Sequence, residues 1–190
     1  MNLDRFAVKF FAQSEPDVDD AAFIDIFHEW IRLKRLNQVM LDVADYRHVP
    51  EGPGIMLVTH EINYAMDRND GKFGLYAQRK VGDEETLKER ILGLVKSTAQ
   101  FGSLLEAEAS LQGKIKLDGS TFHYIANDRL NAPNTEEAFN AIKKDLEAIA
   151  AEIYPGKTVS VTRLDNDPRA RLTAVVTVDD SVDMSSLVAA

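Results

Sequence analysis

The sequence predicts an α+β protein, with a mostly antiparallel sheet and three helices on one of its faces. Three segments carry apolar residues at helical spacing, nine short segments have strand character, and turn residues separate neighbouring strands. The expected order is β-α-β-β-β-β-α-β-β-α-β-β. Residues 73–164 alone read β-α-β-β-α-β, so the fold is expected to be partly ferredoxin-like.

The three helices are predicted from apolar residues that recur every three or four positions. They fall within residues 19–36, 83–108 and 134–156. In the first segment the apolar stripe consists of Ala22, Phe23, Ile26, Phe27, Trp30 and Ile31. Asp83 is the expected N-cap of the second helix, and Asn134 with Glu137 resembles a capping box at the start of the third.

The strands are predicted from short runs rich in β-branched and aromatic residues. The sequence NDGK at residues 69–72 predicts a hairpin between two of them, because Asp-Gly tolerates positive φ. A second hairpin is predicted at Asp118-Gly119 for the same reason. The nine segments are 5–13, 38–46, 54–61, 63–68, 73–79, 114–119, 121–128, 157–164 and 169–178.

The two strands between residues 39 and 60 are apolar at both odd and even positions. A half-solvated antiparallel strand alternates apolar and polar residues, as residues 157–164 do. The stretches VMLDV and GIMLV do not alternate, so both of their faces are expected to be covered. A second sheet, another chain segment or another subunit can supply this cover, and a homodimer formed sheet to sheet is one natural arrangement.

The domain organisation follows from length and from the distribution of Pro, Gly and Ser. The 190 residues suit one domain, and no linker rich in these residues divides the chain. A single α+β domain is therefore expected over residues 1–178, with two fused subdomains, 1–70 and 71–178, as the alternative. Residues 179–190 show no period and are expected to form a frayed or extended tail.

Composition argues against several classes of partner and chemistry. The formal net charge is −9 and no basic run exceeds two residues, which argues against binding to nucleic acid or to an anionic membrane. The chain has no cysteine, which removes disulfides, thiolate catalysis and cysteine-based metal sites. No stretch has the roughly 20 apolar residues of a membrane helix, and the first residues lack a secretory-signal pattern. A cytoplasmic protein with no evident cofactor is expected.

The densest group of polar side chains surrounds the turn Gly52-Pro53-Gly54. We interpret the turn as a tight reversal, because its proline lacks an N–H donor and a strand follows where a phosphate loop would open onto a helix. The sequence HEINY at residues 60–64 lacks the second histidine of a zinc-protease helix. No metal is expected, although His48 and His60 with a nearby carboxylate are an alternative metal site.

A polar pocket for a small molecule is one of two functional hypotheses. No catalytic motif is recognised, so the catalytic residues are unknown. Arg129, in the polar loop 127–139, is the first choice for holding a small anion. The expected pocket residues are Tyr46, His48, His60, Glu61 and Tyr64, together with Arg79 and Arg129.

Two phrases, DVADYRHVPEGPGIMLVTHE at residues 42–61 and NDRLNAPNT at residues 127–135, resemble a family of bacterial proteins of similar length and unknown function. The resemblance starts at FIDIFHEWI, residues 23–31, and covers most of the chain. It implies a bacterial cytoplasmic protein and supplies no activity, substrate or catalytic residue. The main functional hypothesis is a non-catalytic binding or accessory protein that forms a homodimer or joins another protein subunit.

Overall fold

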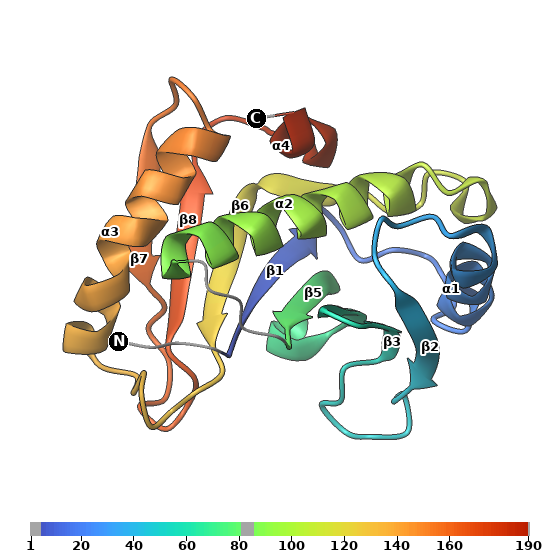
Figure 1. Cartoon of the computed structure of the whole chain (residues 1–190), viewed down its shortest axis with the longest axis horizontal. Coiled ribbons are helices and arrows are strands. Elements are labelled where there is room, and N and C mark those ends of the chain that lie inside the picture. Colours follow the sequence, from blue (N-terminus) through green and yellow to red (C-terminus); the bar gives the residue numbers. More distant parts are fainter. Residues whose placement is uncertain (1–4, 81–85, 190) are drawn as a thin grey trace.

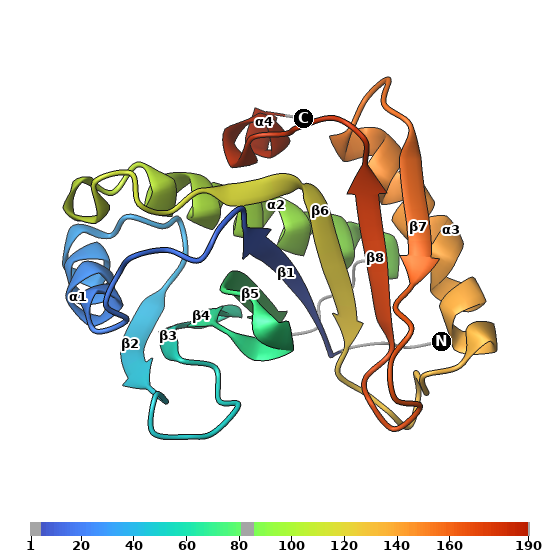
Figure 2. The ribbon, with the colours of Figure 1, turned by 180° about the vertical axis from the view of Figure 1, so that it is seen from behind.

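The computed structural model describes residues 5–80 and 86–189, and its centre is one antiparallel sheet of eight strands (Figures 1 and 2). The strands lie in the spatial order β2-β3-β4-β5-β1-β6-β8-β7. Their bounds are β1 Phe6–Ala12, β2 Met40–Asp45, β3 Ile55–Thr59, β4 Ile62–Asp67, β5 Gly74–Arg79, β6 Leu117–Ala126, β7 Val159–Arg163 and β8 Thr173–Val178. The α+β class and the antiparallel sheet are confirmed.

The three long helices cover one face of the sheet. They are α1 Ala22–Leu33, α2 Leu87–Glu106 and α3 Glu136–Ile153, and a short fourth helix, α4, spans Met184–Ala189. In Figure 1 α2 crosses in front of the strands, and in Figure 2 the strands lie in front of it. α1 contacts β2 and β3, α2 contacts β5, β1 and β6, and α3 contacts β7 and β8. We call the opposite face of the sheet the outer face.

The path of the chain divides the sheet at its centre, between β1 and β6. From β1, α1 carries the chain to the edge strand β2, and β2 to β5 then return strand by strand to β1. From β6, α3 carries the chain to the other edge strand, β7, and β8 returns to β6. Crossovers between co-directional strands are right-handed. Two such halves, arranged about the antiparallel β1–β6 pair, therefore place their helices on the same face.

Aromatic side chains join the helices to the sheet. Phe101 of α2 stacks on Tyr64 of β4 with ring centroids 4.3 Å apart, and it meets Trp30 of α1 at 5.1 Å. On β1 the residues that face the helices are Phe6, Val8 and Phe10, all fully buried. Burying a large apolar side chain contributes about 1.5–3 kcal/mol, so this layer is the main source of stability.

The predicted hairpin at Asp118-Gly119 is wrong, because β6 runs through these residues without a turn. A Cβ on Gly119 would lie 2.6 Å from the carbonyl oxygen of Val182, to which the Gly119 N–H donates a hydrogen bond at 3.0 Å. The glycine therefore marks a close approach of two backbone segments. Residues 73–164 consequently read β-α-β-α-β, so the ferredoxin-like order predicted for this segment is not formed.

The predicted tail is also wrong for residues 184–189, which form α4. Met184 and Leu187 are buried, and α4 packs on α2. A Cβ on Gly102 of α2 would lie 2.8 Å from the Met184 side chain, so the two helices are in close contact. With only two core side chains in one and a half turns, α4 is too short to show a helical period in the sequence.

Two helix starts differ from those predicted. Thr86 caps α2 and forms a capping box with Glu89, whereas the predicted cap Asp83 lies outside the described residues. Thr135 caps α3 by accepting a hydrogen bond from the Ala138 N–H, so the capping box predicted from Asn134 and Glu137 is wrong. The Asn134 side chain instead donates to the backbone of the loop before β8 at 3.1 Å.

The turn between β2 and β3 is a tight reversal, as predicted. Gly54 has φ +66°, and a Cβ there would lie 2.2 Å from the carbonyl oxygen of Met66. A Cβ on Gly52 would lie 2.9 Å from Val49. The Gly54 carbonyl accepts a hydrogen bond from the Tyr46 N–H at 2.8 Å, which extends the β2–β3 ladder. Both glycines are therefore required by close contacts.

The strands between residues 39 and 60 are not covered on both faces within a single chain. In β3 the helix-facing side chains are buried, while Met56 and Val58 on the outer face are half-buried. Around β2 the side chains of Val39 and Leu41 are 65% and 55% exposed. The apolar residues that led to the homodimer prediction thus remain accessible to a partner.

Candidate functional site

His48 and His60 lie at opposite ends of β3. His48 belongs to the β2–β3 connection, and His60 directly follows β3. Because a strand rises about 3.3 Å per residue, the two ends of β3 lie roughly 15 Å apart. Both side chains are exposed. Within the part of the chain that the structure describes, no three His, Asp or Glu side chains are grouped to hold a metal ion.

The other predicted pocket residues are also dispersed. Tyr46 borders a shallow hollow beside the β2–β3 turn, and Glu61 borders a groove at the far end of β3. Tyr64 is buried against α2, and the Arg79 guanidinium lies near Gly93 of α2. Arg129 is exposed in the loop before α3. These residues do not converge on one concave site.

The outer face brings together residues that are far apart in the sequence. The strand register places Tyr76, Lys9, His123 and Val175 in one row across β5, β1, β6 and β8. From β3 to β7 the outer-face residues are Met56, Val58, Asn63, Ala65, Asp67, Gly74, Tyr76, Gln78, Ala7, Lys9, Phe11, Thr121, His123, Ile125, Thr173, Val175, Thr177, Ser160 and Thr162.

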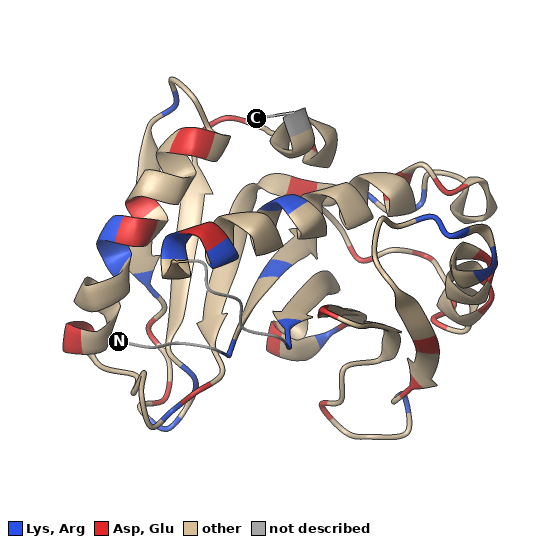
Figure 3. Cartoon of the chain, viewed as in Figure 1, with Lys and Arg blue, Asp and Glu red and all other residues tan. Residues whose placement is uncertain are grey.

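Only one pair of opposite charges occupies these positions. Lys9 Nζ lies 2.6 Å from Asp67 Oδ1, and both side chains are at most 4% exposed. Lys9 also donates to the backbone oxygen of Asn69 at 2.5 Å and faces Asp70 at 3.2 Å. Charged residues make up 28% of the chain, and Figure 3 shows them mainly on the helices and connections. The strand positions of the outer face therefore carry no net charge and are only weakly polar.

His123 is the titratable group at the centre of this face. Its imidazole packs edge-on against Phe11 with ring centroids 4.7 Å apart. Burial lowers the pKa of His123 because it disfavours the imidazolium form; Asp70 opposes this effect and Lys9 adds to it. The imidazole is thus neutral near pH 7, which preserves the neutrality of the outer face.

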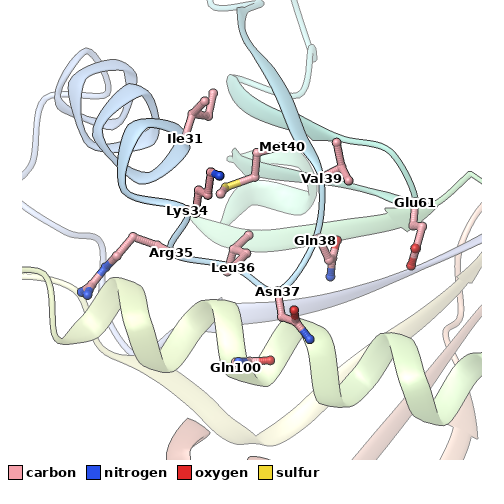
Figure 4. A pocket seen from close by; sticks show the side chains of 10 residues that line it. All are labelled: Ile31, Lys34, Arg35, Leu36, Asn37, Gln38, Val39, Met40, Glu61 and Gln100. Atoms are coloured by element: carbon pink, nitrogen blue, oxygen red, sulfur yellow. The ribbon is translucent and has the colours of Figure 1, made fainter.

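A groove of about 820 Å³ lies at the sheet edge, between the end of α1, the start of β2 and α2 (Figure 4). Its walls combine apolar side chains such as Ile31 and Met40 with polar ones such as Gln38 and Glu61. Gln38 donates to the Tyr64 hydroxyl at 2.9 Å and accepts from the Thr59 hydroxyl at 3.0 Å. This polar wall is therefore held in place by the core.

The residues around the groove offer several kinds of contact to a ligand. Burial raises the pKa of Tyr64 to about 12, so its hydroxyl stays protonated at neutral pH. Lys34, in the left-handed conformation with φ 53°, ends α1 and places an exposed ammonium at the rim. The groove can therefore offer hydrogen bonds, apolar contact and charge to a ligand.

The free edge of the sheet at β2 is blunted. In the β2–β3 register the N–H of Val43 points away from β3, and the Asp42 carboxylate accepts it at 2.8 Å. The register also shifts by one residue between Met40 and Asp42. A capped N–H and a bulge both oppose the addition of another strand.

Sequence reasoning missed the residues at the centre of the outer face. Lys9 carried a signal, since it is the one charged residue within the apolar stretch FAVKFFA. Its partner Asp67 is 58 residues away in the chain. Only the register of β1, β5 and β4 brings the two together, so no local pattern could have paired them.

None of the described helices is long and apolar enough to cross a membrane. No family model, no curated protein and no solved structure matches this chain. The resemblance to bacterial proteins of similar length stays a prediction.

Proposed function

We propose that this protein is a non-catalytic binding module that self-associates through its outer face, with a second copy of the chain as the partner. The observation that carries the proposal is the neutrality of this face, on which Lys9 and Asp67 neutralise each other. The cores of protein interfaces are depleted in charged residues. An antiparallel sheet with helices on one side leaves its other face to water or to a partner.

Charge also favours this mode of contact. Two copies of a chain with net charge −9 repel each other. Approach through the outer face places the neutral surfaces together and keeps the charged helices and connections apart. A two-fold axis through this face would make the contact self-complementary, as in most homodimers.

The outer face also has the extent of a dimer contact. Its seven strands at about 4.8 Å each give a footprint roughly 34 Å wide, and three rows of side chains extend about 20 Å along the strands. The chain itself already buries the side chains of Ala7, Lys9, Ala65, Asp67 and Thr173 within this footprint. The area that a partner covers would therefore come from the half-buried side chains of β3, β5, β6 and β8 and from the exposed ones of β7.

The experiment is to measure the molar mass by sedimentation equilibrium over a range of chain concentrations. The wild-type protein is expected to reach twice the 21.2 kDa chain mass. The double variant Val58→Glu/Thr177→Glu adds charge to both ends of the outer face, where both side chains are half-buried. We expect it to stay monomeric, because unpaired charges in an interface cost several kcal/mol.

The matched control is Ala141→Glu/Ala148→Glu, which adds the same two charges to exposed positions of α3. This variant is expected to dimerise like the wild type, and circular dichroism confirms that each variant is folded. A wild-type chain that is monomeric at every concentration contradicts the proposal. So does a dimer that survives the outer-face variant but is lost in Leu41→Glu, which would assign the contact to the β2 edge.

A second candidate function, binding of a small molecule, is favoured by the groove beside β2. Its volume of about 820 Å³ lies within the range of about 300–1,000 Å³ that is usual for ligand pockets. Ligand-observed NMR with a fragment library tests this function. The NMR signals of a ligand that binds in the groove should change with the wild-type protein and no longer change with Gln38→Ala. They should still change with Gln112→Ala, because Gln112 is exposed and lies outside the groove.

A further inference from the structure

We infer that a small cavity on the outer face, between the 3₁₀ turn η1 (Asn69–Gly71), β6 and the β7–β8 connection, binds a small carboxylate anion. The cavity has a volume of about 100 Å³. Arg171, His123, Thr173, Asn166 and Asp70 contribute polar groups to its wall. The site does not rest on the proposed self-association, but it lies on the same face. The titration that tests it is therefore also made on Val58→Glu/Thr177→Glu, in which a second copy is not expected to cover the cavity.

Arg171 supplies the positive charge. Its Nη1 donates to Asn127 Oδ1 at 2.8 Å and approaches the Tyr76 hydroxyl at 3.4 Å, so neutral groups orient the guanidinium. Among the residues that the structure describes, no Asp or Glu oxygen forms an ion pair with Arg171. A half-buried guanidinium without a carboxylate keeps the rest of its planar fork of N–H donors for a ligand.

His123 of β6 supplies a second polar side chain to the wall of the cavity. Its ring nitrogens make no hydrogen bond with any described residue, and the ring contacts Phe11. The charged groups that face it are Lys9 from β1, Asp70 from η1 and, across the cavity, Arg171. A bound anion would add a negative charge beside the imidazole and accept a hydrogen bond from it.

Size and charge select the class of anion. One water molecule occupies about 30 Å³ in the liquid, so the cavity holds a ligand equivalent to about three waters, which suits acetate. The Asp70 carboxylate lies in the wall, 3.2 Å from Lys9 Nζ. A singly charged planar carboxylate is repelled less by Asp70 than the phosphate dianion is, and it matches the guanidinium fork.

The test is an NMR titration of the full chain with sodium acetate, exchanged against sodium chloride at constant ionic strength. The His123 ring signals are assigned by comparison with His123→Gln. We expect a saturable shift of these signals and a rise in the pKa of His123, because the anion stabilises the imidazolium. Inorganic phosphate is expected to bind more weakly than acetate.

The variants separate the site from general charge effects. Arg171→Gln is expected to weaken acetate binding at least tenfold, and Arg171→Lys is expected to weaken it as well because the fork is lost. Arg169→Gln is the matched control, since Arg169 is exposed in the same connection and pairs with Asp167. It should change the affinity less than twofold.

Three results would overturn the inference. The first is the absence of a saturable acetate shift at His123 in the folded wild-type protein. The second is an equal loss of binding in the Arg169 and Arg171 variants, which would indicate a non-specific charge effect. The third is phosphate binding at least as tight as acetate binding, which would reject the carboxylate class. If Arg171→Gln does not fold, Arg171→Lys and the wild-type pKa of His123 still decide the question.

Discussion

Gly54 shows how a single backbone position fixes the connection between two strands. Gly54 has φ +66°, and a Cβ at this position would lie 2.2 Å from the Met66 carbonyl oxygen. We expect Gly54→Ala to lower the free energy of unfolding by more than about 3 kcal/mol, because both the positive φ and the clash with backbone are unfavourable. Urea denaturation measures the change.

Gly113→Ala is the control for this prediction. Gly113 has φ +72°, and a Cβ there would meet nothing within 4 Å. Gly113→Ala should lower the free energy of unfolding by about 1–2 kcal/mol, because only the positive φ is unfavourable there. Equal losses in the two variants would show that the approach of Met66 has no energetic effect.

The lowered pKa of His123 should make the stability of the protein depend on pH. Burial lowers the pKa of His123 in the folded state, so the unfolded chain binds a proton more readily. The contribution of His123 to the free energy of unfolding is fully present above its usual pKa of about 6.5. This contribution is lost as the pH falls through the lower, folded-state pKa. The melting temperature of the wild type should therefore fall more steeply below about pH 6.5 than that of His123→Gln. Parallel curves, measured in buffers free of carboxylate, would contradict this.

At the scale of elements, α4 tests whether the C-terminal segment belongs to the core. Met184 is fully buried, and α4 packs on α2. Met184→Ala should lower the free energy of unfolding by about 2–4 kcal/mol, because it leaves a cavity between the two helices. Ser185→Ala, at the exposed neighbouring position, should be neutral. Similar small effects in both variants would mean that α4 does not contribute to the core.

The elements also show where local patterns fail. The long amphipathic helices and most strands were predictable, because their periodicity depends on neighbours within a few residues. The Asp118-Gly119 prediction failed because glycine serves either a turn or a close backbone approach, and the distant Val182 decides which one applies. The predicted pocket failed for a similar reason, since the length of β3 separates His48 from His60.

At the scale of the whole molecule, the proposed self-association predicts that stability depends on concentration. A hundredfold rise in chain concentration stabilises a dimer by about 2.7 kcal/mol, or about 1.4 kcal/mol per chain. For a chain of this size the melting temperature should rise by about 3–5 °C. Differential scanning calorimetry of Val58→Glu/Thr177→Glu should show no rise. A concentration-independent wild type would contradict the proposed dimer.

The sequence by itself determined the three long helices, most strands, the β2–β3 reversal and the acidic charge, because each depends on residue type or on neighbours along the chain. The tertiary structure alone decided the strand order, the neutral outer face and its cavity. These depend on register, which joins Lys9 to Asp67 across 58 residues and Arg171 to Tyr76 across 95. Long-range pairing is selected by the burial and charge balance of the whole sheet, and no local sequence pattern encodes it.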